Sequence, residues 1–249
     1  MSRRLAWEAA FVLAAIAAAL AARSFLFAVY AIPSESMLPG LEAGDYVLVD
    51  KWSYGWRKGR AMPRRGDLVV FQAPPDGRDY VKRVIGLPGD SVALRGGAIL
   101  LDGKPLPRWH IADSIVPVTP NSPCRAAGGL PARIERAADG RALCRSPRWR
   151  EMLPGGRTID TLDLGITGGD DVARIVVPAG HLFLLGDNRD RSADSRWPAQ
   201  EGRGVGFVPV DALVGRVRVV LLSVDGRARL ADPHSWARAV RWDRTGTGF

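Results

Sequence analysis

The chain begins with an apolar stretch long enough to cross a membrane. Residues 9–32 contain one charged residue, Arg23, and a helix of this length exceeds a hydrocarbon core of about 30 Å. We expect residues 1–32 to form a cytoplasmic N-terminus and a retained transmembrane helix. A cleavable secretory signal is the alternative, because residues 19–21 are Ala-Leu-Ala, a small-x-small pattern typical of processing sites.

The residues before this stretch predict its orientation. Arg3 and Arg4 precede it, and the positive-inside bias therefore places the N-terminus in the cytoplasm and the rest of the chain across the membrane. No later apolar run is comparable, so one span is expected. The remainder is predicted to be a soluble domain tethered to the membrane.

The tethered part is predicted to be mostly β. Runs of strand length rich in β-branched and aromatic residues alternate with glycine-containing turns such as Asp102-Gly103. The clearest runs are residues 46–49, 67–71, 80–85, 181–185 and 213–224. A mostly β, membrane-anchored catalytic domain is the expected architecture.

Composition changes in the middle of the chain. Residues 105–174 are rich in proline, glycine and arginine, so we interpret them as a smaller inserted β subdomain, and residues 33–104 plus 175–249 as the β core. The tail from residue 227 carries Trp236 and Trp242. It is expected either at the bilayer surface or as a solvated terminal segment.

Two cysteines lie in the predicted insertion. In an exported domain Cys124 and Cys144 favour a disulfide, and closing a loop of this length contributes about 3 kcal/mol on the chain-entropy model. Two unpaired thiols are the alternative, because the sequence does not give their distance.

The net charge of +9 raises the question of an anionic partner. The positive charge is mostly arginine and is scattered, without a basic helix, zinc-finger spacing or RNA-binding aromatic signature. These observations favour a basic surface and no binding of nucleic acid.

Two segments hold side chains suited to nucleophilic chemistry. Pro33 and Pro39 stiffen the stretch that carries Ser34 and Ser36. Lys82 lies in a predicted strand between apolar neighbours, where burial would lower the pKa of its amine. The alternative is a lysine whose stem packs while its head reaches solvent.

A third polar segment, residues 186–196, follows an apolar strand. Its acidic residues at positions 190 and 194, with Ser192 and Glu201, fit four positions of a calcium loop, but Ser195 stands where that loop needs glycine. A histidine triad is also disfavoured, because neither His110 nor His181 lies in a polar cluster with a carboxylate neighbour. Structural histidines are expected instead.

Four segments in this order resemble the signature blocks of bacterial type I signal peptidase, the membrane-bound leader peptidase with a Ser-Lys dyad. They are residues 33–39, 65–71, 80–90 and 186–196, and they follow an N-terminal anchor as in that family. The resemblance covers most of the chain outside the predicted insertion.

The resemblance implies roles for individual residues. Ser36 matches the nucleophile, Lys82 the general base and Ser34 a side chain of the oxyanion hole. Ser192 matches the hydroxyl that orients the lysine, and Asp194 and Arg196 match a supporting pair. The residues that match the lining of the small substrate pockets are Ile32, Met37, Tyr80 and Val81.

The function implied is that of a serine endopeptidase of the cytoplasmic (inner) membrane, with its catalytic domain on the periplasmic side. It would remove N-terminal signal peptides from exported preproteins after Ala-x-Ala sites, without a cofactor or metal. Its expected partners are signal peptides and membrane phospholipid, with the secretion machinery involved only indirectly. A specialised relative that matures a narrow substrate, such as a secreted or conjugative pilus subunit, is the alternative, and a non-catalytic envelope-binding domain is a more distant one.

Overall fold

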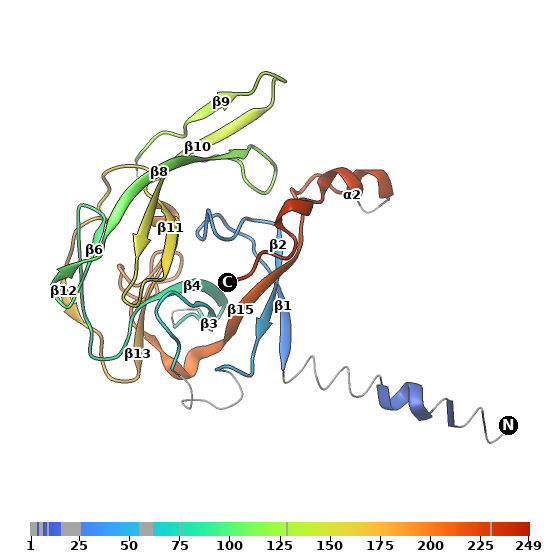
Figure 1. The fold of residues 1–249 in the computed structure, drawn as a ribbon, viewed down its shortest axis with the longest axis horizontal. Helices are drawn as coiled ribbons and strands as arrows, with labels where there is room; N and C mark the ends of the chain where they lie inside the picture. The colour runs from blue at the N-terminus through green and yellow to red at the C-terminus, as the bar shows by residue number, and fades with distance from the viewer. Residues whose placement is uncertain are drawn as a thin grey trace.

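The computed structural model describes residues 4, 7–8, 10–15, 26–54, 62–74, 76–127, 129–229 and 231–249. These residues form three antiparallel sheets with few and short helices (Figure 1). The prediction of a mostly β protein is therefore confirmed.

The largest sheet has seven strands and carries most of the core. Its spatial order is β1 (Phe27–Ala31), β2 (Asp45–Asp50), β15 (Leu213–Ser223), β3 (Leu68–Gln72), β4 (Asp79–Gly86), β13 (His181–Leu185) and β14 (Val208–Pro209). Strands far apart in the sequence therefore pair, as in the register of Leu184 opposite Val84. Alternate side chains of these strands fill two apolar clusters on opposite sides of the sheet.

The structure corrects the predicted end of the membrane anchor. Residues 27–31 form the edge strand β1, paired with β2 from Phe27 opposite Asp50 to Ala31 opposite Tyr46, so an anchor that continues to Ile32 is wrong in this part. None of the helices among the described residues is long and apolar enough to cross a membrane. Residues 16–25, in the middle of the predicted anchor, lie outside the described part of the chain.

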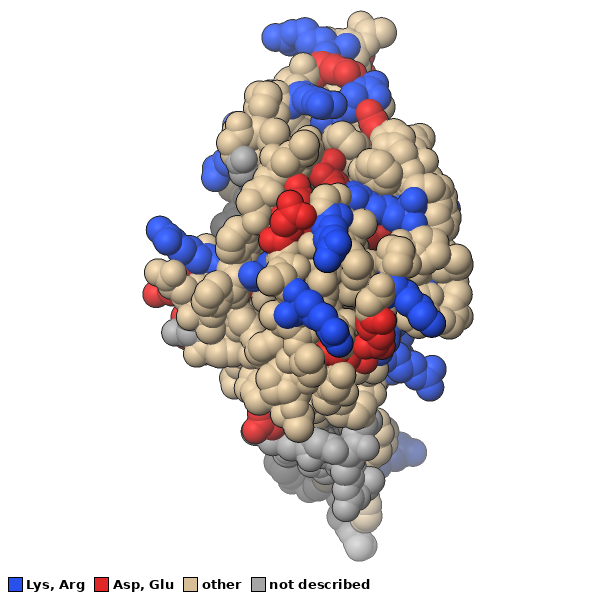
Figure 2. Space-filling view, turned by 90° about the vertical axis from the view of Figure 1, so that its left-hand side faces the viewer, with Lys and Arg blue, Asp and Glu red and all other residues tan. Residues whose placement is uncertain are grey.

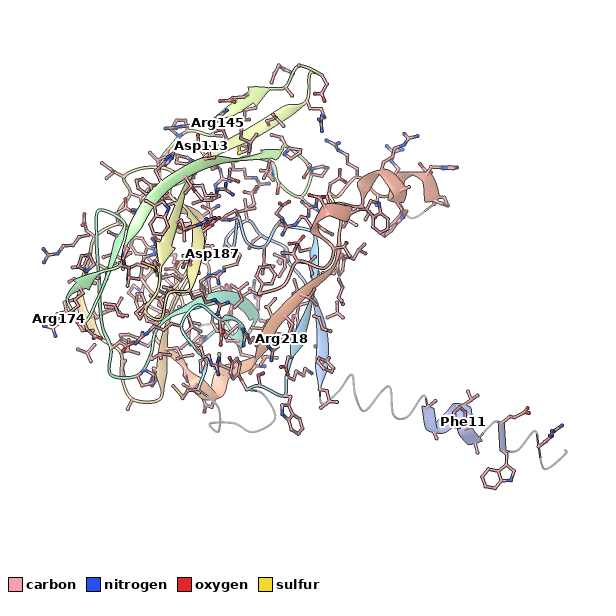
Figure 3. All side chains as sticks on the ribbon, in the orientation of Figure 1. Phe11, Asp113, Arg145, Arg174, Asp187 and Arg218 are labelled. Carbon is pink, nitrogen blue, oxygen red and sulfur yellow. A yellow bond between two sulfur atoms is a disulfide. The ribbon has the colours of Figure 1, made fainter. Side chains whose placement is uncertain are left out.

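A second sheet lies within the predicted insertion. It consists of β8 (Arg108–Pro117), β9 (Ile134–Arg136), β10 (Ala142–Met152) and β11 (Thr158–Leu162), with β10 between β8 and β11. Asp113 of β8 and Arg145 of β10 form an ion pair at 3.3 Å, in the upper part of the molecule in Figure 3. A disulfide joins Cys124 to Cys144, the latter in β10.

A third sheet pairs strands from either end of the predicted insertion. Its order is β12 (Val172–Val176), β5 (Ser91–Arg95), β6 (Ala98–Leu101) and β7 (Lys104–Pro105). Leu153 and Ile159 of the predicted insertion share one buried cluster with Ile85 and Phe183 of the seven-stranded sheet. Both parts therefore contribute to one hydrophobic core, and the division at residues 105 and 174 stays a prediction.

The C-terminal tail returns onto the large sheet. It contains the short helix α2 (Pro233–Ala239) and a 3-10 turn, η3 (Trp242–Arg244). Arg244 Nη2 lies 2.6 Å from Asp45 Oδ2, and Phe249 packs against the cluster that includes Met37. A wholly solvated terminal segment is thus wrong for these last residues.

Positive and negative side chains are interspersed on the surface. The face shown in Figure 2 has lysine and arginine beside aspartate and glutamate at several places among uncharged residues. Many arginines are paired, for example Arg150 with Asp160 at 2.6 Å and Arg218 with Asp50 at 2.6 Å. Part of the positive charge of the arginines is therefore neutralised by ion pairs between strands.

Candidate active site

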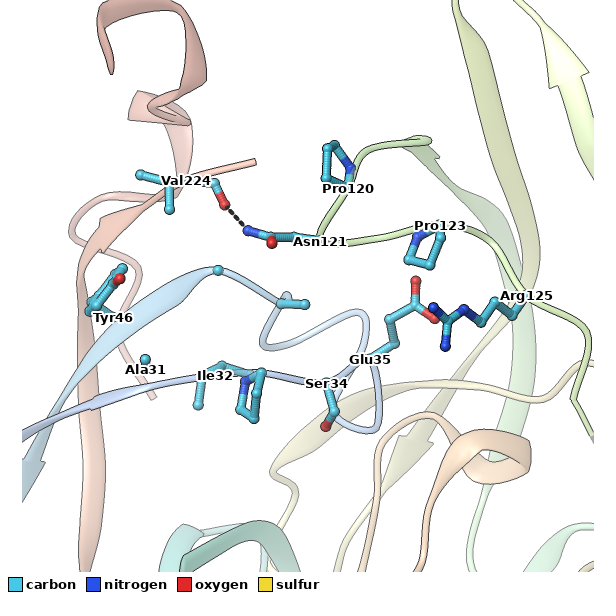
Figure 4. A pocket seen from close by; sticks show the side chains of 13 residues that line it. Ala31, Ile32, Ser34, Glu35, Tyr46, Pro120, Asn121, Pro123, Arg125 and Val224 are labelled. Carbon is cyan, nitrogen blue, oxygen red and sulfur yellow. Dashed lines mark hydrogen bonds between the residues drawn. The ribbon is translucent and has the colours of Figure 1, made fainter. Parts of the chain in front are cut away.

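The two serines after β1 face each other. The Oγ atoms of Ser34 and Ser36 are 3.2 Å apart, within hydrogen-bond distance. The intervening Glu35 points the other way: Figure 4 shows its carboxylate and the Ser34 hydroxyl on opposite sides of the backbone. The segment is a bend that leads into a turn, and it presents both hydroxyls on one side.

Strand β4 brings Lys82 to this segment. Lys82 stands opposite Val69 of β3 in the sheet, and its side chain is directed to Ser36, with Lys82 Nζ donating a hydrogen bond of 2.9 Å to Ser36 Oγ. Lys82 is 4% exposed and Ser36 is 9% exposed. The alternative of a lysine head in solvent is therefore wrong.

Burial changes the acidity of this amine. It lowers the pKa of Lys82 from the ordinary 10.5 to about 8, although the nearby Asp194 and Asp187 act in the opposite direction. The charged form loses hydration that the surrounding protein replaces only in part. An appreciable fraction of Lys82 is consequently neutral near neutral pH and able to accept a proton.

The loop 186–196 packs against both groups and is held by buried ion pairs. Asp194 and Arg196 pair at 2.9 Å, and Asp194 Oδ2 also accepts a hydrogen bond of 3.0 Å from the Gly186 amide. Burial raises the pKa of Asp194, but the charge and hydrogen bond of Arg196, together with hydrogen bonds from Gly186 and Ser192, make the net shift downward. Asp194 is therefore ionised and accounts for part of the charge around Lys82.

Ser192 lies in the same loop with its hydroxyl buried. A Cβ added at Gly186 would come within 2.2 Å of Ser192 Oγ and 2.7 Å of the Ser36 carbonyl oxygen, so these three residues are in close contact. Within the described residues Ser192 Oγ makes no hydrogen bond to Lys82. Its orienting contact with Lys82 stays a prediction.

A cleft of about 440 Å³ opens over Ser36 and Lys82. All four residues predicted to contact substrate line it, namely Ile32, Met37, Tyr80 and Val81. Ile32 and Met37 are buried in the core, whereas Tyr80 and Val81 are partly exposed. Sequence reasoning missed other lining residues, among them Tyr30, Ala31, Asp79, Arg191 and Ala193.

A second hollow of about 470 Å³ adjoins the cleft, since both are lined by the stretch Ala31–Ser34. Figure 4 shows it between this stretch and the loop that contains Asn121 and Arg125. Asn121 Nδ2 donates a hydrogen bond of 2.9 Å to the Val224 carbonyl oxygen, which ties that loop to the end of β15.

Asn188 is a site residue to which the sequence analysis gave no role. Its amide donates to the Ser36 carbonyl oxygen and its Nδ2 to the Glu35 carbonyl oxygen, each at 3.1 Å. The side chain is 1% exposed. The polar composition of its loop indicated a site there. The residues that Asn188 contacts, Glu35 and Ser36, are distant in the sequence, so motif spacing alone could not predict these hydrogen bonds.

The calcium loop and the histidine triad, the two other kinds of site weighed from the sequence, can be compared with the contacts of their residues. Asp190 accepts from the Leu164 amide at 2.6 Å and from Thr167 Oγ1 at 2.8 Å, which occupies its carboxylate within the protein. His110 does have a carboxylate neighbour, Asp113 at 3.2 Å, contrary to expectation. That pair is partly exposed on β8, and neither residue lines the cleft.

Comparison with known proteins confirms the resemblance. A family model described as "Signal peptidase, peptidase S26" matches residues 4–222. The chain belongs to this signal peptidase family. Signal peptidase I of Pseudomonas fluorescens is 34% identical over 219 residues, which cover 82% of this chain and 68% of that protein. Signal peptidase I of Rickettsia typhi is 31% identical over 232 residues, which cover 84% and 76%.

A solved structure of a signal peptidase I from Enterococcus faecalis is also similar, with 22% identity, a TM-score of 0.32, and coverage of 62% of this chain and 96% of that one. Membership of the family rests on the family model and the sequence relatives. As a member of the signal peptidase family, the chain is a serine endopeptidase that removes signal peptides from exported preproteins.

Proposed function

We propose that Ser36 and Lys82 form the catalytic dyad of this signal peptidase. The observation that carries the proposal is the buried hydrogen bond of 2.9 Å between Lys82 Nζ and Ser36 Oγ. A lysine can act as a general base only when it is neutral, and the depressed pKa of about 8 supplies that form.

The proposed reaction has two steps. Neutral Lys82 takes the proton of Ser36 Oγ, which attacks the scissile carbonyl carbon; the resulting ammonium then protonates the leaving amine, and the mature chain departs. Water, activated by the again neutral Lys82, attacks the acyl-enzyme ester and releases the signal peptide. The proton on Lys82 returns to Ser36, so the enzyme is regenerated.

Ser34 is proposed to stabilise the oxyanion together with the Ser36 amide. Its hydroxyl lies 3.2 Å from Ser36 Oγ, close enough to reach an oxygen that develops on the attacked carbon. A single donor of this kind contributes on the order of 10²-fold in rate. Ser192, Asp194 and Arg196 are proposed to orient Lys82, as the close packing of their loop supports.

The cleft is proposed to accept small side chains at the Ala-x-Ala end of the signal. Its wall contains the bulky residues Met37 and Tyr80 beside Ile32 and Val81, which leave room for alanine and clash with larger groups. Substrate specificity then follows from the shape of the cleft.

We propose that the apolar stretch before β1 tethers the enzyme to the cytoplasmic membrane and places the β-domain on the outer side. Phe27 and Val29, on the edge strand, are 43% and 57% exposed, as suits a strand that lies near lipid. The test is a topology experiment in which protease added outside spheroplasts digests the β-domain; protection of that domain would refute the orientation.

The dyad is tested with the full chain in detergent and a preprotein whose signal ends in Ala-x-Ala. We expect wild type to cut after the second alanine, and Ser36→Ala and Lys82→Ala to be folded but inactive. Lys104→Ala, at an exposed lysine, is the matched control and should keep full activity. Substantial cleavage by Lys82→Ala would refute the proposed base.

A further inference from the structure

Glu35 stands between the two serines but belongs to the opposite side of their segment. Figure 4 shows its carboxylate directed into the second hollow, away from the Ser34 hydroxyl. Glu35 therefore has no direct contact with the reacting atoms. Whatever holds this carboxylate also holds the backbone that carries Ser34 and Ser36.

The partner of Glu35 is Arg191. Arg191 Nη1 lies 2.6 Å from Glu35 Oε2, and the two side chains are 12% and 14% exposed. An ion pair with this little exposure is screened less than a surface pair. Arg191 also lines the cleft over Ser36, whereas Glu35 lines the second hollow. The ion pair therefore joins the two sides of the segment that carries the serines.

Arg191 belongs to the 3-10 turn η1 (Arg189–Arg191), whose other two residues are fixed by contacts with the rest of the protein. Arg189 forms a buried ion pair of 2.6 Å with Glu151 of β10, and Asp190 accepts from Thr167 and the Leu164 amide. A side chain on such a turn can act as a fixed point for a neighbouring segment.

We infer that Arg191 is a positioning residue, which acts through Glu35 to hold the Ser34–Ser36 segment in register with Lys82. The inference rests on the proposed function, in which Ser36 is the nucleophile. The Asn188 hydrogen bonds hold the backbone of this segment at two carbonyl oxygens, and the ion pair adds a third attachment through a side chain. Misplacement of a reacting group by about 1 Å can cost 10²-fold in rate.

The test is a double-mutant cycle with Glu35→Ala, Arg191→Ala and the double variant, assayed on the Ala-x-Ala preprotein. We expect each single variant to lower kcat by about tenfold or more, with KM changed by less than about twofold, because positioning affects the reaction more than binding. The double variant should be no slower than the slower single variant, since both changes break one attachment. Arg191→Lys should recover part of kcat.

A matched control separates positioning from a general loss of stability. Arg65 and Asp90 form an ion pair with similar exposure, 18% and 12%, outside the residues that line the cleft. Arg65→Ala should lower the thermal unfolding temperature while kcat of the folded enzyme stays unchanged. Additive losses in the Glu35 and Arg191 cycle, or losses in kcat that follow the folded fraction as in Arg65→Ala, would overturn the inference.

The same assay distinguishes the inference from the function on which it rests. If Ser36→Ala is inactive while Arg191→Ala and Glu35→Ala keep wild-type kcat, only the positioning role is overturned. If Ser36→Ala is active, the nucleophile is wrong and the inference fails with it.

Discussion

Lys82 Nζ donates a 2.9 Å hydrogen bond to Ser36 Oγ across 46 positions of sequence. Two features of the fold produce this contact. Strand β4 lies inside the seven-stranded sheet and buries Lys82, whereas Ser36 follows the edge strand β1 in a turn held by Asn188. The proposed base therefore lies in the interior of the sheet, and the proposed nucleophile lies in a turn that hydrogen bonds hold against it.

The first prediction concerns the pH dependence of cleavage. Because Lys82 must be neutral and its pKa is about 8, kcat/KM should rise about tenfold per pH unit below pH 8 and level off above it. The measurement is kcat/KM of the full chain in detergent from pH 5.5 to 9.5. A limb centred near pH 6.5, the ordinary pKa of histidine, would instead indicate a histidine base and contradict the dyad.

The second prediction concerns stability, because the same burial makes Lys82 costly to the fold. Between about pH 8 and 10.5 the unfolded chain holds a proton on Lys82 that the folded chain lacks, so the free energy of unfolding gains a contribution that rises with pH in this window. Lys82→Met removes the buried cation and should be more stable than wild type at pH 7, by about 1–3 kcal/mol.

Chemical denaturation at pH 7 and pH 10 measures this effect. The gain of Lys82→Met over wild type should shrink at pH 10, where wild-type Lys82 is neutral in the folded state. Lys104→Met, at an exposed position, serves as the control and should show no such pH dependence. Equal stability of Lys82→Met and wild type at pH 7 would show that Lys82 is not desolvated as the structure indicates.

The third prediction concerns Gly186, where the loop meets the serine segment. A Cβ at this position would lie 2.2 Å from Ser192 Oγ and 2.7 Å from the backbone oxygen of Ser36. Gly186→Ala must therefore displace the nucleophile segment, and we expect it to abolish cleavage and destabilise the protein by about 1–3 kcal/mol.

The matched control for this change is Gly168→Ala. At Gly168 the nearest atom to an added Cβ is in Trp197, 3.8 Å away, an ordinary contact. This variant should cleave as wild type does. Retention of activity by Gly186→Ala would mean that the loop and Ser36 are less closely packed in solution.

Local sequence patterns predicted part of this fold, and particular residues explain why strands β1 and β10 could not be predicted. Lys82 could be recognised because it interrupts an apolar strand. The strand β1 could not be told from an anchor, because Phe27 and Val29 on its outward face are apolar and remove the alternation on which strand prediction depends. Strand β10 was hidden by Pro147, which lacks an amide donor and sits at a β-bulge between Ser146 and Arg148.

Some residues of the candidate site could likewise be predicted from the sequence, and others could not. The serines and the lysine could be proposed from their chemistry and order in the chain. The roles of Asn188 and Arg191 depend on contacts with residues more than a hundred positions away, and such contacts arise from sheet topology. The polarity of the loop 186–196 indicates that Asn188 and Arg191 belong to a site, but it does not predict which residues they contact.

The last prediction concerns the ion pair that joins strand β10, in the predicted insertion, to the loop 186–196. Arg189 and Glu151 are 3% and 1% exposed, and two hydrogen bonds of 2.9 and 2.6 Å connect them. Removal of one partner leaves a buried charge without compensation, which costs about 3–5 kcal/mol. We expect Glu151→Leu to destabilise the protein by this amount and to lower activity, because Arg189 precedes the residues that support Lys82.

A second variant distinguishes the lost charge balance from a loss of shape. Glu151→Leu combined with Arg189→Met replaces the pair by apolar side chains, and we expect it to recover most of the stability. Arg150→Gln, which breaks a more exposed pair on the same strand, should have no measurable effect on unfolding. If the double variant is no more stable than Glu151→Leu, the pair is required for its geometry as well as for its charge, and strand β10 then acts directly on the shape of the loop 186–196.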